Sequence, residues 1–128
     1  MNPILRMLSL TYCGITAEGA EALFEIFIYS RSALEEVNLS GNLLMNEGVV
    51  QILKGLSIAK SLKKILLADN QFSFDEEEVM KTLEFCMKKN EKLAKYDLKY
   101  NTVSIEGKSP QTFPTSSHLG IALQIQKT

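Results

Sequence analysis

The chain has 128 residues, of which 45% are hydrophobic and 23% charged, and these values are ordinary for a single globular domain. A formal net charge of −1 argues against nucleic acid or an anionic membrane as the partner. The two cysteines stand far apart, and we find neither a signal peptide nor a membrane-spanning stretch. We therefore expect buried thiols without a disulfide, no membrane insertion, and a cytoplasmic location.

One eleven-residue pattern occurs four times, beginning at Leu5, Leu34, Leu62 and Leu93. Successive copies begin 29, 28 and 31 residues apart. Each copy has apolar residues at its first, fourth, sixth and eleventh positions. The ninth positions are Cys13, Asn42, Asn70 and Asn101. The pattern resembles the signature of leucine-rich repeats.

Each copy predicts a short strand, because alternate residues of an extended chain point to the same side. The intervening stretches predict helices, since their apolar residues recur at helical spacing. Those residues are Ala20, Leu23, Phe24 and Phe27, then Val49, Ile52, Leu53 and Leu56, then Val79, Leu83, Cys86 and Met87. Thr16 and Asn46 are expected to cap the first two helices, and Ser73 or Asp75 the third. Parallel strands joined by helices predict an α/β solenoid.

Two further features recur with the repeats. The asparagines are expected to bind backbone groups in the turn after each strand, because buried backbone groups need partners, and Cys13 is expected to fill the same site. Glycine stands fourteen residues after the first leucine in three copies, as Gly19, Gly48 and Gly107, which predicts close approach of the helix to its surroundings. The third copy has Glu76 there and is the longest, so a bulge or an extra half-turn is expected in it.

The two ends of the chain differ. The first strand begins almost at once, without a polar cap, so we expect a partner chain or further repeats to cover its edge. Residues 1–108 are predicted to form the four repeats. Residues 109–117, with Pro110 and Pro114, predict a loop. Residues 118–128 alternate like a strand and are expected to form either a degenerate C-terminal cap strand or a partner-binding tail.

The long period, the asparagine or cysteine position and the full helix in each repeat resemble the ribonuclease-inhibitor-type leucine-rich repeats. The resemblance covers residues 4 to about 107. It implies a short horseshoe with parallel strands on the concave face and α-helices on the convex face. It also implies a non-catalytic protein–protein interaction module, such as a scaffold or adaptor of a larger intracellular assembly, with a cytoskeletal or ciliary complex as one setting. Two alternatives remain open: a small-GTPase regulator like the Ran GTPase-activating protein, and an actin-binding regulator.

Partner binding is predicted on the concave face, where variable positions of successive repeats line up in columns. Tyr12, Leu66 and Tyr100 are the leading candidates, because tyrosine is enriched where binding energy concentrates. Simple coverage of the sheet is the alternative. Glu36 and Lys64 are expected to form a surface ion pair. The predicted partner-binding residues are Tyr12, Glu36, Asn38, Lys64, Leu66, Lys95, Asp97 and Tyr100.

The remaining chemical signals are interpreted as structural. Residues 75–78 are acidic at a helix start, and Lys88 and Lys89 lie at its end, where the helix dipole favours each charge. His118 stands alone, without a serine or cysteine placed to form a triad. Phe72 and Phe74 are expected to close the core under the third turn. We therefore predict no enzymatic activity, no cofactor and no metal site.

Overall fold

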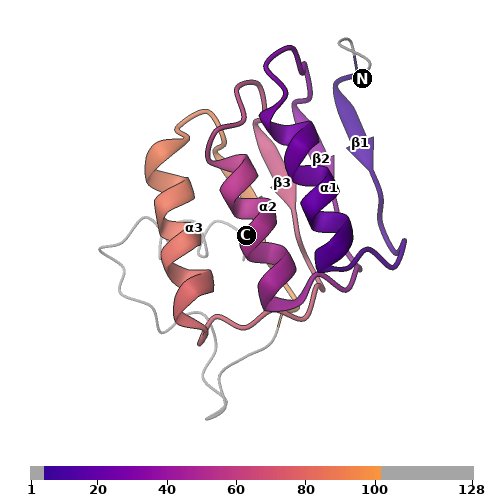
Figure 1. Ribbon diagram of the computed structural model, residues 1–128, viewed down its shortest axis with the longest axis vertical. Coiled ribbons are helices and arrows are strands. Elements are labelled where there is room, and N and C mark those ends of the chain that lie inside the picture. The colour runs from indigo at the N-terminus through magenta and orange to yellow at the C-terminus, as the bar shows by residue number, and fades with distance from the viewer. Residues whose placement is uncertain (1–4, 102–128) are drawn as a thin grey trace.

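The computed structural model describes residues 5–101, in which strands and helices alternate (Figure 1). The elements are β1 (Met7–Ser9), α1 (Ala17–Ile28), β2 (Glu36–Asn38), α2 (Met45–Leu56), β3 (Lys64–Leu66), α3 (Glu77–Lys89) and β4 (Lys95–Asp97). Each predicted strand and helix within this range is present. The predicted helix near Gly107, the loop 109–117 and the segment 118–128 with His118 lie outside the described residues.

The strands form one parallel sheet in the order β1-β2-β3-β4. Equivalent repeat positions are register partners, so that Met7, Glu36, Lys64 and Lys95 form one row. The three helices of the described range lie side by side on one face of the sheet (Figure 1). This arrangement is the predicted α/β leucine-rich repeat solenoid.

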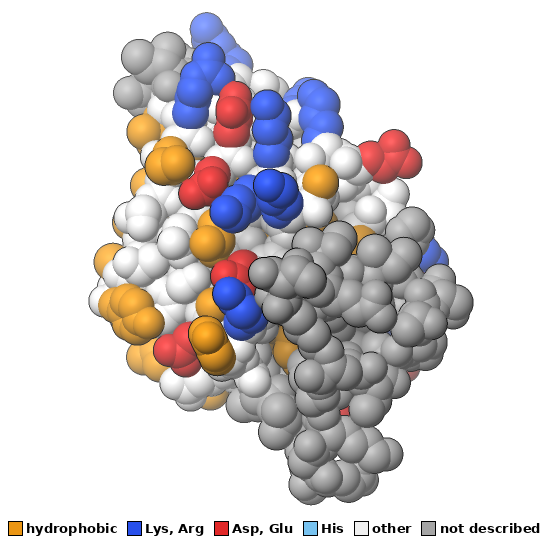
Figure 2. All heavy atoms as spheres, turned by 180° about the vertical axis from the view of Figure 1, so that it is seen from behind, with side chains coloured by type: hydrophobic (Ala, Val, Ile, Leu, Met, Phe, Trp, Pro, Cys, Tyr) orange, Lys and Arg blue, Asp and Glu red, His pale blue; other side chains and the backbone are white. Residues whose placement is uncertain are grey.

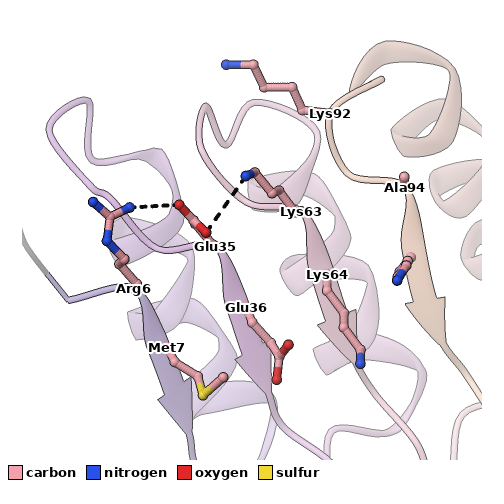
Figure 3. Close-up of a pocket in the computed structure, with 9 residues that line it drawn as sticks. Arg6, Met7, Glu35, Glu36, Lys63, Lys64, Lys92 and Ala94 are labelled. Atoms are coloured by element: carbon pink, nitrogen blue, oxygen red, sulfur yellow. Dashed lines mark hydrogen bonds and ion pairs between the residues drawn. The ribbon is translucent and has the colours of Figure 1, made fainter.

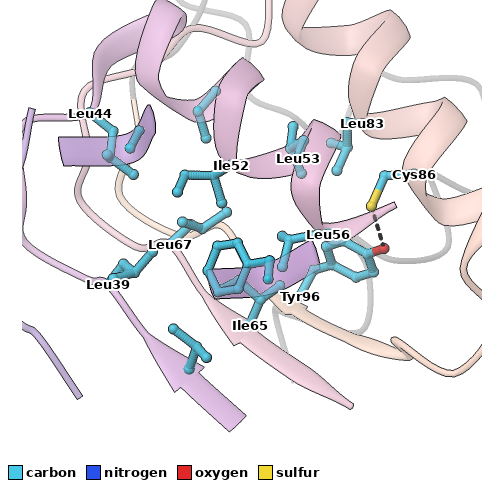
Figure 4. Packing of buried hydrophobic residues seen from close by; sticks show 14 of the residues in the cluster. Leu39, Leu44, Ile52, Leu53, Leu56, Ile65, Leu67, Leu83, Cys86 and Tyr96 are labelled. Carbon is cyan, nitrogen blue, oxygen red and sulfur yellow. Dashed lines mark hydrogen bonds between the residues drawn. The ribbon is translucent and has the colours of Figure 1, made fainter. Parts of the chain in front are cut away.

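The core lies between the sheet and the helices (Figure 4). Val37 and Ile65 at the fourth position, and Leu39 and Leu67 at the sixth, are fully buried. Leu5 is 37% exposed, in contrast, because no described strand covers the outer side of β1. Burial of a large aliphatic side chain is worth about 1.5–3 kcal/mol, so the inner repeats contribute most to stability.

The turn after β3 is closed by two aromatic rings, as predicted. Phe72 and Phe74 are buried, with their ring centroids 5.3 Å apart at a tilt of 57°. Such tilted pairs add about 0.5–1.5 kcal/mol beyond the area they bury. The extra residues of the third repeat lie in this turn, between β3 and α3, so the repeat is enlarged there and its helix has nearly the usual length.

A ladder of asparagine side chains binds the backbone where the strands end. Asn42 accepts hydrogen bonds at Oδ1 from the N–H groups of Cys13 (2.9 Å) and Ile15 (3.0 Å). Its Nδ2 donates to the carbonyl oxygens of Leu10 and Leu39, both at 2.8 Å. One buried side chain thus holds two successive repeats, and the predicted role of the ninth position is confirmed.

The next two asparagines repeat this bonding. The Nδ2 group of Asn70 donates to the carbonyls of Leu39 (2.9 Å) and Leu67 (3.2 Å). Asn101 accepts the backbone N–H of Asn70 at 2.8 Å and donates to the Leu67 carbonyl at 3.1 Å. The asparagines are therefore coupled to one another across the strands.

Cys13 differs from the asparagines that follow it. The prediction of two buried thiols is wrong for Cys13, which is exposed, and right for Cys86. Both cysteines are free. The Cys13 Sγ atom lies 3.4 Å from the Thr11 carbonyl oxygen, within its own repeat, and forms no bond to another repeat of the described range. Cys13 lies in the turn after β1, which is the outermost strand of the described sheet.

The helix starts differ from the predicted caps. Thr16 stands at the N-cap of α1 without a side-chain capping bond, and the N-cap of α3 is Glu76 rather than Ser73 or Asp75. Asn46 is not a cap, because α2 already begins at Met45. Its Oδ1 instead accepts the backbone N–H of Ser73 at 2.7 Å, which ties α2 to the turn of the next repeat.

The recurrent glycine has the predicted packing role at Gly48. A Cβ atom there would lie 3.0 Å from Leu44 Cβ and 3.2 Å from Ala17 Cα. Because Ala17 is the first residue of α1, Gly48 lets the starts of α1 and α2 approach each other closely. Any larger residue would push the two repeats apart.

Candidate protein-binding surface

The face of the sheet away from the helices carries the third and fifth residues of each repeat. We name these residues the open face: Met7, Ser9, Glu36, Asn38, Lys64, Leu66, Lys95 and Asp97. Met7 is 62% exposed, and Lys95 is also exposed. Leu66 is half-buried rather than exposed as predicted, because strands on both sides flank it.

The predicted tyrosines do not lie on the strands themselves. Tyr12, Gly41, Asp69 and Tyr100 follow β1 to β4 in equivalent turns, and we name them the turn row. All four have left-handed backbone conformation, with φ values of 52°, 74°, 52° and 60°. Such values are uncommon outside glycine, so their recurrence shows that the turn itself requires them. Tyr12 and Tyr100 are 75% and 80% exposed.

Backbone hydrogen bonds hold the turn row in register. The N–H of Tyr12 donates to the Ser40 carbonyl at 3.1 Å, and the N–H of Gly41 donates to the Ala68 carbonyl at 2.9 Å. The Tyr12 ring lies so close over Gly41 that a Cβ atom there would overlap it. Glycine at this position therefore makes room for the neighbouring aromatic ring.

Two predicted binding residues also stabilise these turns. Asn38 accepts the Ser40 N–H at Oδ1 over 3.0 Å. Asp97 accepts the Lys99 N–H over 3.2 Å, and its other oxygen lies 3.8 Å from the Lys99 Nζ. Side chains of this type bind the backbone two residues further on and favour turns. Asn38 and Asp97 therefore have a structural role in presenting the turn row.

The predicted ion pair between Glu36 and Lys64 is not formed, although the two residues are register partners. Within the described range, the carboxylate that pairs at this edge is Glu35, one residue earlier (Figure 3). Its oxygens lie 2.7 Å from Arg6 Nη1 and 3.8 Å from Lys63 Nζ. Arg6, Glu35 and Lys63 are the second residues of successive repeats, and they pair because they stand side by side where the strands begin.

A shallow hollow of about 450 Å³ lies where the strands begin. We name it the basic hollow; it is lined by Arg6, Met7, Glu35, Glu36, Lys63, Lys64, Lys92, Ala94 and Lys95. Figure 3 shows side chains from all the strands reaching into this region. Figure 2 shows lysine and arginine side chains gathered toward one end of the face seen from behind the helices. Lys64 and Lys95 are among the predicted partner-binding residues, whereas Arg6, Lys63 and Lys92, which also line the hollow, are not.

The buried thiol of Cys86 is not a reactive nucleophile. Cys86 Sγ lies 3.4 Å from the Tyr96 hydroxyl inside the core (Figure 4). Burial raises the pKa of Cys86 to about 11, and burial likewise raises the pKa of Tyr96 above its ordinary value. Both groups stay protonated at neutral pH, and a protonated thiol is a poor nucleophile.

Residues 5–101 contain neither a metal-binding cluster nor a helix suited to cross a membrane. No cluster of three or more histidine, cysteine, aspartate or glutamate side chains is arranged there to hold a metal ion. Among the helices in this part of the chain, none has the length and apolar character needed to cross a membrane.

Comparisons with known proteins agree with this architecture. A family model described as "Leucine Rich repeat" matches residues 2–24. Ribonuclease inhibitor of Mus musculus is 33% identical over 84 residues, which is 65% of this chain and 18% of the inhibitor. The chain thus spans less than a fifth of the length of this relative. Together with the stacked repeats and their asparagine ladder, these matches support a leucine-rich repeat protein that is similar to the ribonuclease-inhibitor type.

Proposed function

We propose that this chain is a non-catalytic protein–protein interaction module that binds its partner through the open face and the turn row. Leucine-rich repeat proteins generally mediate such interactions, and stacked repeats provide an extended surface for them. The observation that carries the proposal is the exposure of Tyr12 and Tyr100, at 75% and 80%, on turns fixed by backbone hydrogen bonds. Rigid, exposed tyrosines are efficient contact residues, because little entropy is lost when they bind.

The proposed contact residues are Tyr12, Glu36, Asn38, Lys64, Leu66, Lys95, Asp97 and Tyr100. Leu66 supplies an apolar centre between polar neighbours, and the charged residues at the start of the strands select the partner. Partner proteins are also proposed to cover the outer side of β1, where Leu5 and Met7 are exposed. An edge strand with exposed apolar residues is a ready site for pairing.

In this proposal the chain serves as a scaffold or adaptor in a larger cytoplasmic assembly, and a cytoskeletal or ciliary complex remains one setting for it. Stimulation of GTP hydrolysis in a small GTPase would instead support the GTPase-regulator alternative. Co-sedimentation with actin filaments would support the actin-binding alternative. Neither result is expected of a scaffold with a different partner.

Affinity purification with mass spectrometry tests the proposal. The tagged chain is compared with a variant that carries Tyr12→Ala, Leu66→Ala and Tyr100→Ala. A matched control carries Tyr29→Ala, Ile58→Ala and Phe85→Ala. These control side chains are also large, apolar and exposed, at 36%, 42% and 55%, and lie outside the open face and the turn row.

The first variant should lose the proteins that the wild-type chain captures, and the control should keep them. Circular dichroism must show that both variants remain folded, because Leu66 is half-buried. Equal capture by the folded first variant, or loss only in the control, would mean that the binding surface lies elsewhere.

A further inference from the structure

The basic hollow holds more positive than negative charge. Five cationic side chains and two carboxylates line it, in a protein whose overall charge is −1. Arg6 and Lys63 share the Glu35 carboxylate. Lys64, Lys92 and Lys95 form no ion pair with any carboxylate of the described residues. The positive charge of these three side chains is therefore not neutralised by a carboxylate of the described residues.

The adjacent positions of Lys64 and Lys95 destabilise the folded protein when no anion is bound. The two residues are direct register partners on β3 and β4. Adjacent strands lie about 4.8 Å apart, and like charges directly opposite each other destabilise a sheet. Lys92 adds a third positive charge to the same hollow, and its Nζ is held by the Lys60 carbonyl at 3.1 Å. A bound anion would relieve the repulsion that the free protein carries.

The row of third-position residues indicates which anion fits. Across the sheet the row contains Met7, Glu36, Lys64 and Lys95. An exposed apolar residue thus comes first, followed by a carboxylate that forms no ion pair within residues 5–101, and then by two lysines. A continuous chain of phosphates would place negative charge against Glu36. A peptide can instead place an apolar residue on Met7, a hydrogen-bond donor at Glu36 and carboxylates at the two lysines.

From this complementarity we infer that the basic hollow binds an acidic segment of a protein partner. Glutamate or aspartate side chains lie between Lys64 and Lys95 and beside Lys92, and an apolar residue of the segment packs on Met7. The inference rests on the proposed function, and it adds the chemical class of the partner and the part of the surface that selects it.

Fluorescence polarisation tests this inference with a labelled peptide in which leucine and serine precede a run of glutamates. Binding should weaken as salt is added, because screening reduces the attraction. The variant with Lys64→Glu and Lys95→Glu should bind roughly tenfold or more weakly, since each reversal replaces an attraction with a repulsion. The control with Lys54→Glu and Lys89→Glu changes the net charge equally and should bind within about twofold of wild type.

A second variant guards against misfolding. Lys64→Gln with Lys95→Gln removes the repulsion without adding negative charge, so it should keep or raise the melting temperature while it weakens peptide binding. If the two lysines only stabilised the fold, this double substitution would instead lower the melting temperature.

Several results would overturn the inference: no binding, equal binding of a peptide with glutamine in place of glutamate, or equal loss in the control. Tighter binding of labelled oligothymidine than of the acidic peptide would show a nucleic-acid surface instead. The variant with alanine at Tyr12, Leu66 and Tyr100 should still bind this peptide. If this alanine variant loses its cellular partners and the wild-type chain does not bind the acidic peptide, the proposed function is supported and the acidic partner is ruled out. The reverse pattern would retain the acidic ligand and remove the tyrosine surface.

Discussion

Replacement of Asn70 by alanine removes the central link of the asparagine ladder. Asn70 is fully buried, and its Nδ2 group donates to the carbonyls of Leu39 and Leu67. Its Oδ1 lies 3.4 Å from the backbone N–H of Leu44, at the N-cap of α2. Asn70→Ala therefore breaks bonds to the residues that directly follow β2 and β3, and to the start of a helix.

The magnitude depends on which groups keep a partner. The two carbonyls retain bonds from Asn42 (2.8 Å) and Asn101 (3.1 Å), so each loses only one of its hydrogen bonds, worth about 1 kcal/mol. The Leu44 N–H is left buried without the side-chain acceptor, which costs about 1–3 kcal/mol. Together these contributions predict a loss of about 3–5 kcal/mol in the free energy of unfolding. For a domain of this size that corresponds to roughly 10–20 °C in melting temperature.

Urea denaturation followed by circular dichroism measures this loss, with Asn38→Ala as the control. Asn38 is half-buried and accepts only the Ser40 N–H among the described contacts, so its replacement should cost about 1 kcal/mol or less. The reasoning would be refuted if Asn70→Ala cost no more than Asn38→Ala, because the ladder would then contribute no more than an ordinary turn.

The remaining predictions concern packing and the thiols. Gly48→Ala should destabilise the protein by about 1–3 kcal/mol, because the new Cβ atom would press on the Ala17 backbone. Gly19→Ala should change the stability by under about 1 kcal/mol, because its Cβ atom would contact only the Ile15 side chain. Thermal melts of the two variants test this difference. In the folded protein Cys13 should react at once with a thiol reagent, whereas Cys86 should react only after denaturation. Equal reaction rates of the two thiols in the folded protein would contradict the burial of Cys86. Because the folded pKa of Cys86 is about 11, the unfolded chain loses its proton first, so stability should fall from about pH 9 to pH 11 by up to about 1.4 kcal/mol per pH unit. Cys86→Ala should show a smaller decrease over this range than wild type.

The repeat alignment predicted the strand register because identical positions must stack when each repeat buries the same leucines. It predicted the asparagine ladder for the same reason, since a buried polar group at a fixed position meets the same backbone atoms in every repeat. Helix starts were less predictable. Asn46 is a good capping residue by type, but the larger third turn places the Ser73 N–H within its reach, and this contact depends on tertiary structure.

The geometry of the candidate binding surface could be predicted only in outline. The repeat period predicts which residues share a column, and so places Tyr12, Lys64, Leu66 and Tyr100. The sequence of a single repeat, however, does not indicate the left-handed turn that carries the two tyrosines. Only Gly41 in the row suggests it. The pairing of Glu35 rather than Glu36 depends on where each side chain leaves the strand, which the alignment does not specify.

Hydroxyl-radical footprinting of the chain with a captured partner tests the central claim most directly, because the method reports the solvent exposure of individual side chains. The proposed binding surface predicts protection of Tyr12 and Tyr100 on partner binding, while Phe85 on α3 stays reactive. Protection of Phe85 with both tyrosines unchanged would show that the partner binds the helices, and would contradict the account.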